Sequence, residues 1–327
     1  MLFRKKETNY TRLFYATDLH GSETCFLKIL NAGKLYEANS IIVGGDVTGK
    51  QIIFLLLNDD GSYATRFLGQ DWHLKNTEEL EKLEKRITNS GFYPYRSTSV
   101  EVEDLNNNHS KMDKLFERLC IERLQKWCRI AKERLQETSI NIYMTGGNDD
   151  GFYIERVLKE DEFVIDPEDQ VVRMDEHHEM LSLGYSNMTP WSCYRDISEE
   201  ELAKKIDNLS EQVADMKNCV FNIHVPPFES EIDQVPKLDT TTNPPQPIYE
   251  GGAPVMVPAG STAVREAIEK HQPLLGIHGH IHESRGAIHI GRTLVINPGS
   301  EYGEGILRGI IINLEKGGIK GYQFVSG

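Results

Sequence analysis

Three short apolar runs in the first half of the chain each stop at a polar loop. They cover residues 13–16, 40–43 and 140–144. Continuous apolar runs of this length are typical of strands that are buried on both faces. Residues 23–32 lie between the first two runs and are helix-like, so that strand, helix and strand form a βαβ unit with parallel pairing. The pattern predicts an α/β fold built on a parallel sheet.

The stretch between the second and third runs breaks this pattern. One helix is expected to open at a capping box at residues 76–79, and a longer one to cover about residues 111–137 with an apolar stripe. Residues 92–109 between them have the composition of a loop. We therefore expect a helical insertion, placed like a lid, at about residues 58–138 of a single domain that covers residues 1–327.

Short apolar runs in the second half of the chain predict a second sheet. Its strands are expected at residues 163–165, 171–173, 180–183, 309–314 and 319–325. Further buried strands are expected at residues 219–223 and 293–296. The Pro- and Gly-rich residues from about 226 to 260 predict a long surface loop. The predicted fold class is α/β: a four-layer αββα sandwich in which two mixed β-sheets pack face to face and helices cover both outer sides.

Three histidines at every second position follow an apolar run near the end of the chain. They are His278, His280 and His282. Period two puts alternate side chains on one face of an extended segment, so His280 and His282 can lie on the same side. Neutral imidazole is the commonest metal ligand in proteins, which makes this stretch a candidate metal site. Taken alone, the stretch fits a His-rich surface turn equally well.

Polar side chains follow the other predicted strands in the same way. Asp18 and His20 follow the first run, Asp46 the second, Asn148 the third and His224 the strand at 219–223. Functional side chains collect at the carboxyl ends of strands in such sheets. Each residue alone fits a turn or a helix cap. Together they form a mixed nitrogen and oxygen site for two divalent ions, with Asp46 placed to bridge them because a carboxylate has two oxygens.

Composition narrows the partners of such a site. The chain has 36 basic and 50 acidic residues, a net charge of −14, which repels polyphosphate backbones and makes nucleic acid an unfavourable partner. Its five cysteines are scattered, which argues against a disulfide framework and a thiolate zinc site. No apolar stretch is long enough to span a bilayer, so we expect a cytoplasmic protein with no membrane partner.

The ordered set of motifs resembles that of the calcineurin-like metallophosphoesterase superfamily. The motifs are Asp18-x-His20, Gly45-Asp46, Gly147-Asn148-Asp149, His224 and Gly279-His280-x-His282. The segment Asn297-Pro298-Gly299-Ser300 is similar to a feature of its smaller bacterial and archaeal members. Outside the insertion and the predicted surface loop, the resemblance covers nearly the whole chain.

The resemblance implies two divalent metal ions, of manganese, iron, zinc or nickel, and a metal-bridging hydroxide that attacks phosphorus. One ion would be held by Asp18, His20, Asp46 and His282, and the other by Asp46, Asn148, His224 and His280. The implied substrate is a small phosphomonoester or phosphodiester.

The chain departs from the family at one position of the site. The family usually has histidine after the asparagine, whereas this chain has Asp149, so Asn148 and Asp149 are the candidate catalytic residues. A carboxylate beside a phosphate is repulsive unless it is protonated or turned away. The proton for the leaving group would then come from His278 or from a histidine of the pair 177–178, or the substrate would have a good leaving group. The pair itself lies in an acidic turn and is expected at the surface.

Two other functions stay open at this point. One is a non-catalytic scaffold that keeps the fold and binds a partner protein through the inserted helices, which Asp149 favours. The other is a nuclease of the same superfamily, which the acidic balance disfavours.

Overall fold

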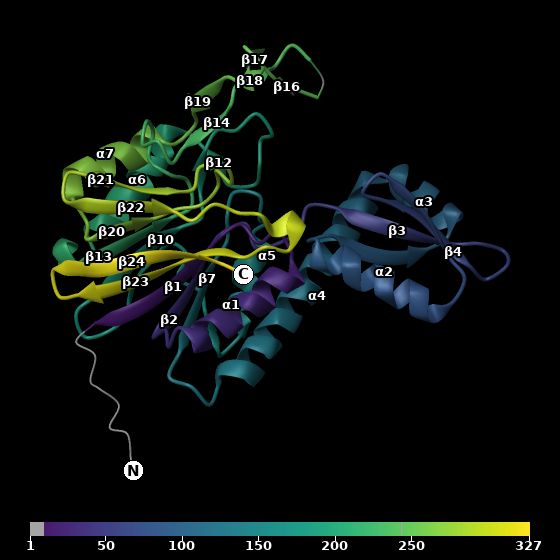
Figure 1. The fold of residues 1–327 in the computed structure, drawn as a ribbon, viewed down its shortest axis with the longest axis horizontal. Coiled ribbons are helices and arrows are strands. Elements are labelled where there is room, and N and C mark those ends of the chain that lie inside the picture. The colour runs from purple at the N-terminus through teal and green to yellow at the C-terminus, as the bar shows by residue number, and fades with distance from the viewer. Residues whose placement is uncertain (1–9, 243) are drawn as a thin grey trace.

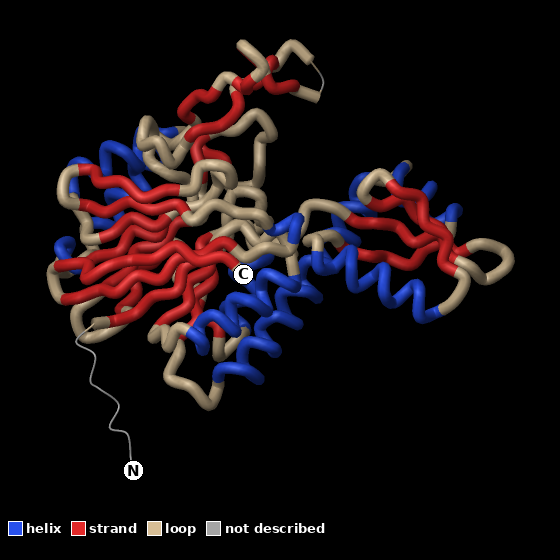
Figure 2. Tube along the Cα trace, viewed as in Figure 1, coloured by secondary structure: helices blue, strands red, loops and turns tan. Residues whose placement is uncertain are grey.

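The computed structural model describes residues 10–242 and 244–327. Residues 1–9, the start of the predicted single domain, and position 243 in the predicted surface loop lie outside the described residues. Two six-stranded sheets lie face to face in the body of the molecule (Figures 1 and 2).

The first sheet is built around the parallel strands of the N-terminal half. In spatial order it contains β24 (Gly318–Ser326), β23 (Arg308–Glu315), β1 (Thr11–Ala16), β2 (Ser40–Gly44), β7 (Asn141–Thr145) and β8 (Val164–Ile165). Strands β1, β2, β7 and β8 pair in parallel, and β23 and β24 add antiparallel strands at one edge. The sheet is therefore mixed.

The second sheet has the same plan. In spatial order it contains β21 (Gly286–Ile290), β22 (Thr293–Asn297), β20 (Leu275–Ile277), β13 (Cys219–Ile223), β10 (Glu179–Leu183) and β9 (Gln170–Arg173). The four central strands are parallel, and β21 and β9 are antiparallel at the two edges.

Three clusters of buried apolar residues define the layers: one lies between the two sheets, and one lies between each sheet and the helices that cover it. Helices α1 (Glu23–Leu35), α4 (His109–Leu135) and α5 (Tyr153–Glu160) cover the outer face of the first sheet, and α6 (Glu199–Ser210) and α7 (Thr262–His271) cover that of the second. Along β1, Leu13 and Tyr15 face the other sheet, while Phe14 and Ala16 face the helices. Both faces of each sheet are thus covered, which explains the continuous apolar runs. The predicted four-layer αββα fold is confirmed.

Three strands belong to a different sheet from the one predicted. The segments 163–165, 309–314 and 319–325 lie in the first sheet, as β8, β23 and β24, rather than in the second. The pattern of apolar residues shows that a strand is buried, but not which sheet edge it pairs with. Strand β23 pairs with β1 from the far end of the chain, so only the tertiary fold decides its sheet. The strands predicted at 171–173 and 180–183 lie in the second sheet, as expected.

The insertion is not purely helical, so that part of the prediction is wrong. It contains a sheet of order β5 (Gln70–Leu74), β4 (Tyr63–Phe67), β3 (Ile52–Leu57) and β6 (Tyr93–Ser97), with helices α2 (Thr77–Asn89) and α3 (Ser99–Asn106). We call residues 51–108 the inserted unit. The segment 92–109, predicted as a loop, forms β6 and α3. Strands β4 and β5 are half exposed and turn at Leu68 and Gly69, a pair without the usual hairpin signal, so their pattern is weak.

Helix α4 joins the inserted unit to the body. Its first half packs in the core of the inserted unit through Leu115 and Cys120. Its second half packs on the first sheet, where the Trp127 ring stacks on Phe26 with ring centroids 4.4 Å apart. In Figure 1 the inserted unit projects to one side of the body at the end of this helix. One continuous helix thus contributes to the hydrophobic core of the inserted unit and to that of the body.

The segment from about 226 to 260 is not an unstructured loop, apart from position 243, which is not described. It contains three short antiparallel ladders, which pair β14 (Gln234–Pro236) with β19 (Met256–Pro258), β15 (Leu238–Asp239) with β16 (Gln246–Pro247), and β17 (Tyr249–Glu250) with β18 (Ala253–Pro254). They form an arm at the top of Figure 1. Strands of two or three residues are too short for sequence periodicity to reveal.

None of the helices in the described part of the chain combines the length and the apolarity that crossing a membrane requires.

Candidate metal centre

The candidate ligands lie in the loops that follow the parallel strands of both sheets. Asp18 and His20 follow β1, Asp46 follows β2, and Asn148 follows β7 in the first sheet. In the second sheet, His224 follows β13, and His280 and His282 follow β20. Because parallel strands end at the same edge, the loops of the two sheets meet there. In Figure 1 this edge faces the side to which the inserted unit is attached.

The structure brings all seven candidate ligands together in two groups. Ligand atoms of Asp18, His20, Asp46 and His282 lie within 4.8 Å of one another, and so do those of Asp46, His224 and His280. The amide oxygen of Asn148 lies 2.9 Å from Nδ1 of His280 and so joins the second group. Asp46 belongs to both groups.

Four of the seven ligands have a backbone that ordinary residues avoid. The φ angles of Asp18, His20, Asp46 and His280 are 55°, 40°, 47° and 65°. The left-handed region costs a residue with a side chain about 1–2 kcal/mol, and such strain persists only where the surrounding structure holds it. The surrounding structure therefore holds these four candidate ligands in place against the backbone strain.

Glycines before three of the ligands leave room for the opposite loop. A Cβ atom on Gly147 would lie 2.2 Å from the backbone nitrogen of Asp46, and one on Gly279 would lie 2.4 Å from Oδ2 of Asp18. A Cβ on Gly45 would lie 2.4 Å from Nδ1 of His224. The loops therefore approach more closely than any side chain allows.

The carboxylates of the site are held in the charged form. Burial alone would raise the pKa of Asp18, but the hydrogen bond and charge of His282 lower it to about 2. Burial alone would also raise the pKa of Asp46, but the charge of the neighbouring His224 brings it well below its usual value. Both side chains can therefore offer oxygen ligands at neutral pH without losing a proton.

The imidazoles divide into two kinds. Burial lowers the pKa of His20 to about 3 and that of His280 to about 4, so both rings are neutral, as ligands must be. Burial would also lower the pKa of His224, but Asp46 raises it to about 10. A cation beside Asp46 would take the place of the proton that His224 holds.

An unpaired buried nitrogen atom among the candidate ligands indicates that these residues fit a metal ion. Nε2 of His224 is buried and has no hydrogen-bond partner among the described residues. Buried polar atoms without a partner are costly and rare. Nε2 of His224 lies 3.4 Å from Oδ2 of Asp46, in a set of imidazole, carboxylate and amide groups. This donor set suits a divalent transition metal.

Two further carboxylates that sequence reasoning missed support the ligand loops. Asp150 accepts hydrogen bonds from the backbone nitrogens of Val47, Thr48 and Gly147, each at 2.8 Å, and so ties the loop after β2 to the loop after β7. Asp196 accepts the amide N–H of Asn148 at 3.1 Å, which turns the amide oxygen toward His280. Asp150 follows Asn148 closely enough to be noticed in the sequence, whereas nothing marks Asp196.

The predicted catalytic position is occupied by an ion pair. Oδ2 of Asp149 lies 2.6 Å from Nζ of Lys50, and its Oδ1 accepts the thiol of Cys193 at 2.9 Å. The Tyr302 ring, also missed, lies close to the site, with its centroid 4.6 Å from that of His20. The Asp149 carboxylate is therefore neutralised by a lysine and is not turned away from the site.

The proposed alternative proton donors do not reach the site. His278 follows β20, and its Nδ1 lies 2.7 Å from the carbonyl oxygen of Ile223 in β13. His178 precedes β10 and so lies at the end of that strand opposite the ligands. It is buried, so the expectation that the pair 177–178 lies at the surface is wrong for this residue. Its hydrogen bonds to Asp175 explain why a histidine in an acidic turn is buried.

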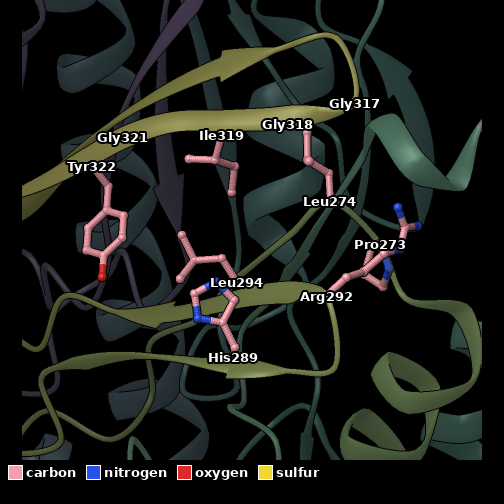
Figure 3. Close-up of a pocket in the computed structure, with 10 residues that line it drawn as sticks. All are labelled: Pro273, Leu274, His289, Arg292, Leu294, Gly317, Gly318, Ile319, Gly321 and Tyr322. Atoms are coloured by element: carbon pink, nitrogen blue, oxygen red, sulfur yellow. The ribbon is translucent and has the colours of Figure 1, made fainter.

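A cavity elsewhere in the molecule does not involve the candidate ligands. It has a volume of about 330 Å³ and opens between the edges of the two sheets. Figure 3 shows its lining, which includes Leu274, Leu294, Ile319 and Tyr322. Leu274 precedes β20, whereas the ligands follow that strand, so the cavity lies at the other end of the sheets.

Comparisons with known proteins concern the fold. No family model matches the chain. The uncharacterised protein MJ1162 of Methanocaldococcus jannaschii is 31% identical over 132 residues, which are 40% of this chain and 52% of that protein. The chain thus spans about half the length of this curated relative. A solved crystal structure aligns over 97% of this chain and 98% of its own, with 15% identity and a TM-score of 0.56.

Two further solved structures are less similar. They are TT1561 of Thermus thermophilus, with 12% identity, 97% and 98% coverage of the two chains and a TM-score of 0.49, and an archaeal phosphodiesterase, with 13% identity, 97% and 100% coverage and a TM-score of 0.35. The likeness to the crystal structure with a TM-score of 0.56 extends over nearly the whole of both chains. The chain therefore shares its overall fold, two packed mixed sheets with helices on both outer sides, with that crystal structure.

Proposed function

We propose that this protein is a metal-dependent phosphoric ester hydrolase that holds two divalent ions and acts on a small phosphate ester. The observation that carries the proposal is the place of Asp46 in both groups of ligand atoms. A carboxylate shared in this way holds two cations at neighbouring positions. Manganese, iron, zinc or nickel suits the mixed donor set.

Each residue has a defined part in this proposal. Asp18, His20 and His282 would hold one ion, and Asn148, His224 and His280 would hold the other, with Asp46 serving both. Divalent ions in such a pair lower the pKa of bound water to about 7 and neutralise charge on phosphoryl oxygens. The protein keeps the carboxylates of Asp18 and Asp46 charged and the imidazoles of His20 and His280 neutral, whereas His224 must release a proton before it can bind an ion.

Metal analysis of three variants tests the ligand assignment. Purified protein is stripped with a chelator and reloaded with manganese, and its metal content is measured. We expect two ions per chain in the wild type, one in His282→Ala, one in His280→Ala and none in Asp46→Ala, because only Asp46 is shared. His289→Ala, an exposed histidine away from the ligands, serves as control and should keep both ions.

Turnover is measured on the same proteins with an aryl phosphomonoester and an aryl phosphodiester in the presence of each metal. We expect hydrolysis by the wild type and its loss in Asp46→Ala. If Asp46→Ala keeps two ions and full activity, the shared role of this residue is refuted.

The scaffold alternative is favoured by one observation, the carboxylate of Asp149 where the family usually has histidine. A protein that binds two ions but hydrolyses neither ester with any of the metals would support this alternative. A nuclease is disfavoured by the net charge of −14, and a strong, salt-dependent affinity for DNA would argue for it.

A further inference from the structure

The accessible side of the metal centre carries a lysine. Asp18, His20, Asp46 and His224 are almost fully buried, so a substrate cannot approach from their side. The side chain of Lys50 is 48% exposed, and that of its partner Asp149 is 22% exposed. The ion pair and the His282 side chain, which is 26% exposed, therefore lie on the accessible side of the candidate ligands.

The backbone before Lys50 is held in place from two directions. The carboxylate of Asp150 accepts hydrogen bonds from the backbone N–H groups of Val47 and Thr48. The hydroxyl oxygen of Tyr93 accepts a hydrogen bond from the backbone N–H of Gly49 at 2.9 Å. Tyr93 belongs to the inserted unit, so the loop is held between the body and that unit. The position of Lys50 relative to the ligands is thus built into the fold.

Asp149 holds the side chain of Lys50 against the ligands. Its carboxylate lies 2.6 Å from Nζ of Lys50 and 3.9 Å from Nδ1 of His20. Its backbone N–H donates to Oδ1 of Asp46 at 3.0 Å, which fixes the residue beside the shared ligand. The ammonium group has three N–H donors, and the contact with Asp149 leaves donors free for a phosphate oxygen.

We infer that Lys50 binds the phosphoryl oxygens of the substrate, that Asp149 is the residue that positions it, and that the pair favours terminal phosphate groups over diesters. The inference rests on the proposed function. Near neutral pH a terminal phosphate carries close to two negative charges and a diester carries one. A fixed cation on the accessible side of a site rich in carboxylates therefore attracts a terminal phosphate more strongly than it attracts a diester.

Phosphate binding to the reloaded protein provides a readout that does not depend on turnover. Inorganic phosphate is titrated calorimetrically into manganese-loaded wild type, Lys50→Gln and Lys50→Arg. We expect the dissociation constant to rise roughly tenfold to a hundredfold in Lys50→Gln, because a charge-assisted hydrogen bond is lost, and to be largely restored in Lys50→Arg.

Lys126→Gln is a matched control. Lys126 forms an ion pair with Glu23, also at 2.6 Å, in which the lysine side chain is 48% and the glutamate side chain 18% exposed. The substitution removes the same charge from an equally exposed pair outside the ligand groups. It should leave phosphate affinity and metal content unchanged.

The kinetic readout compares a monoester and a diester with the same aryl leaving group. In Lys50→Gln we expect KM for the monoester to rise in step with the phosphate dissociation constant, and kcat/KM for the diester to fall much less. An equal loss for both esters would overturn the preference for terminal phosphate.

The positioning role of Asp149 is tested by a double-mutant cycle on phosphate affinity. In the Lys50→Gln background the Asp149 carboxylate has lost its lysine and repels phosphate, so adding Asp149→Asn should tighten binding. In the wild-type background the same change should have a much smaller effect or the opposite one. Equal effects in both backgrounds would mean that the two residues act independently.

The outcomes separate this inference from the proposed function. If the reloaded wild type holds two ions but Lys50→Gln binds phosphate as tightly as the wild type, the inference fails and the metal centre stands. If the wild type takes up no metal ions, the proposed function fails, and the inference fails with it.

Discussion

At the scale of single residues, the orientation of one amide determines whether the second ligand group can form. Asn148 can present either an oxygen or an NH₂ group to a cation, and only the oxygen is a ligand. Asp196 accepts the N–H of this amide at 3.1 Å, so the oxygen faces His280. The other oxygen of Asp196 accepts the backbone N–H of Cys193 at 2.9 Å, which holds the carboxylate in place.

We therefore predict that Asp196→Ala weakens the binding of one ion and leaves the binding of the other unchanged. Loss of a hydrogen bond that orients a ligand costs about 10–100-fold in metal affinity. The ion held by Asn148 should lose affinity by this factor, and the ion held by Asp18 and His20 should not. Calorimetric titration with manganese measures both. Asp196→Asn, which can still accept the hydrogen bond, should behave nearly as the wild type, and an equal loss at both ions would indicate general damage to the fold.

A glycine in the same loop gives a second prediction at this scale. Gly147→Ala would place a Cβ atom 2.2 Å from the backbone nitrogen of Asp46, a contact that no side-chain rotation relieves. The two loops must then separate, so both ions should bind more weakly because Asp46 serves both. Metal content after reloading tests this. Gly321→Ala, whose Cβ would meet nothing within 4 Å and whose φ is not positive, should retain two ions; a Gly147→Ala protein with two tightly bound ions would contradict the prediction.

At the scale of elements, the inserted unit is fastened to the loop that carries Asp18 and His20. Arg123 of α4 donates to the carbonyl oxygens of Gly21 at 2.7 Å and Phe92 at 2.9 Å, and its guanidinium lies 4.3 Å from the centre of the Tyr93 ring. Gly21 follows His20 directly, whereas Phe92 and Tyr93 belong to the inserted unit. One arginine on a helix shared by both cores thus joins a ligand loop to the inserted unit.

Arg123→Ala should lower the free energy of unfolding by about 2–3 kcal/mol, because two partly buried carbonyl oxygens lose a charged donor and the ring loses its cation. Denaturant unfolding followed by circular dichroism measures the change. Arg129→Ala on the same helix is the control, since Arg129 is exposed and its removal should cost under about 0.5 kcal/mol. Equal effects of the two substitutions would show that Arg123 does not fasten these elements.

At the scale of the whole molecule, an ion pair in a turn of the second sheet forms hydrogen bonds to the first sheet at the end away from the ligands. Asp175 lies between β9 and β10 of the second sheet and accepts hydrogen bonds from Thr11 of β1 in the first sheet and from His178. His178 Nε2 in turn lies 3.2 Å from the carbonyl oxygen of Glu315 in β23. Burial would lower the pKa of His178, but the hydrogen bond and charge of Asp175 raise it above its usual value.

The stabilisation from this pair depends on pH. Burial would raise the pKa of Asp175, but the hydrogen bonds from His178 and Thr11 lower it, so its contribution is present above the unfolded pKa of about 3.9 and is lost as pH falls. The raised pKa of His178 makes its contribution complete below the unfolded pKa of about 6.5 and lost as pH rises through the folded value. The pair stabilises the fold most at about pH 4–6.5.

We predict that His178→Gln destabilises the protein by about 1–3 kcal/mol near pH 5 and by less near pH 9. Unfolding is followed in denaturant at both pH values. The same substitution at the exposed neighbour His177 should change the free energy of unfolding by under about 0.5 kcal/mol at either pH. A loss in His178→Gln that is as large at pH 9 as at pH 5 would show that the charge of the pair does not matter.

The sequence predicted the core of the fold and the candidate ligands because both depend on local signals. The buried strands β1, β2 and β7 are continuous apolar runs, and Asp18, Asp46 and Asn148 follow them directly. The same signal was absent from the hairpin of β4 and β5, which is half exposed, and from Asp196, which lies far along the chain from the asparagine that it orients. Lys50 was missed because a single lysine after a glycine is common in loops.

By itself, the sequence determined which segments are buried and which polar residues follow them. Both depend on the pattern of apolar and polar residues that are neighbours in the sequence. Only the tertiary structure decided which strand edges pair, and so placed β23 beside β1 from the opposite end of the chain. It also decided that Asp149 faces Lys50 and that Asp175 faces Thr11 and His178. Contacts of this kind depend on how loops from different strands meet in space, and no pattern within either loop specifies the partner.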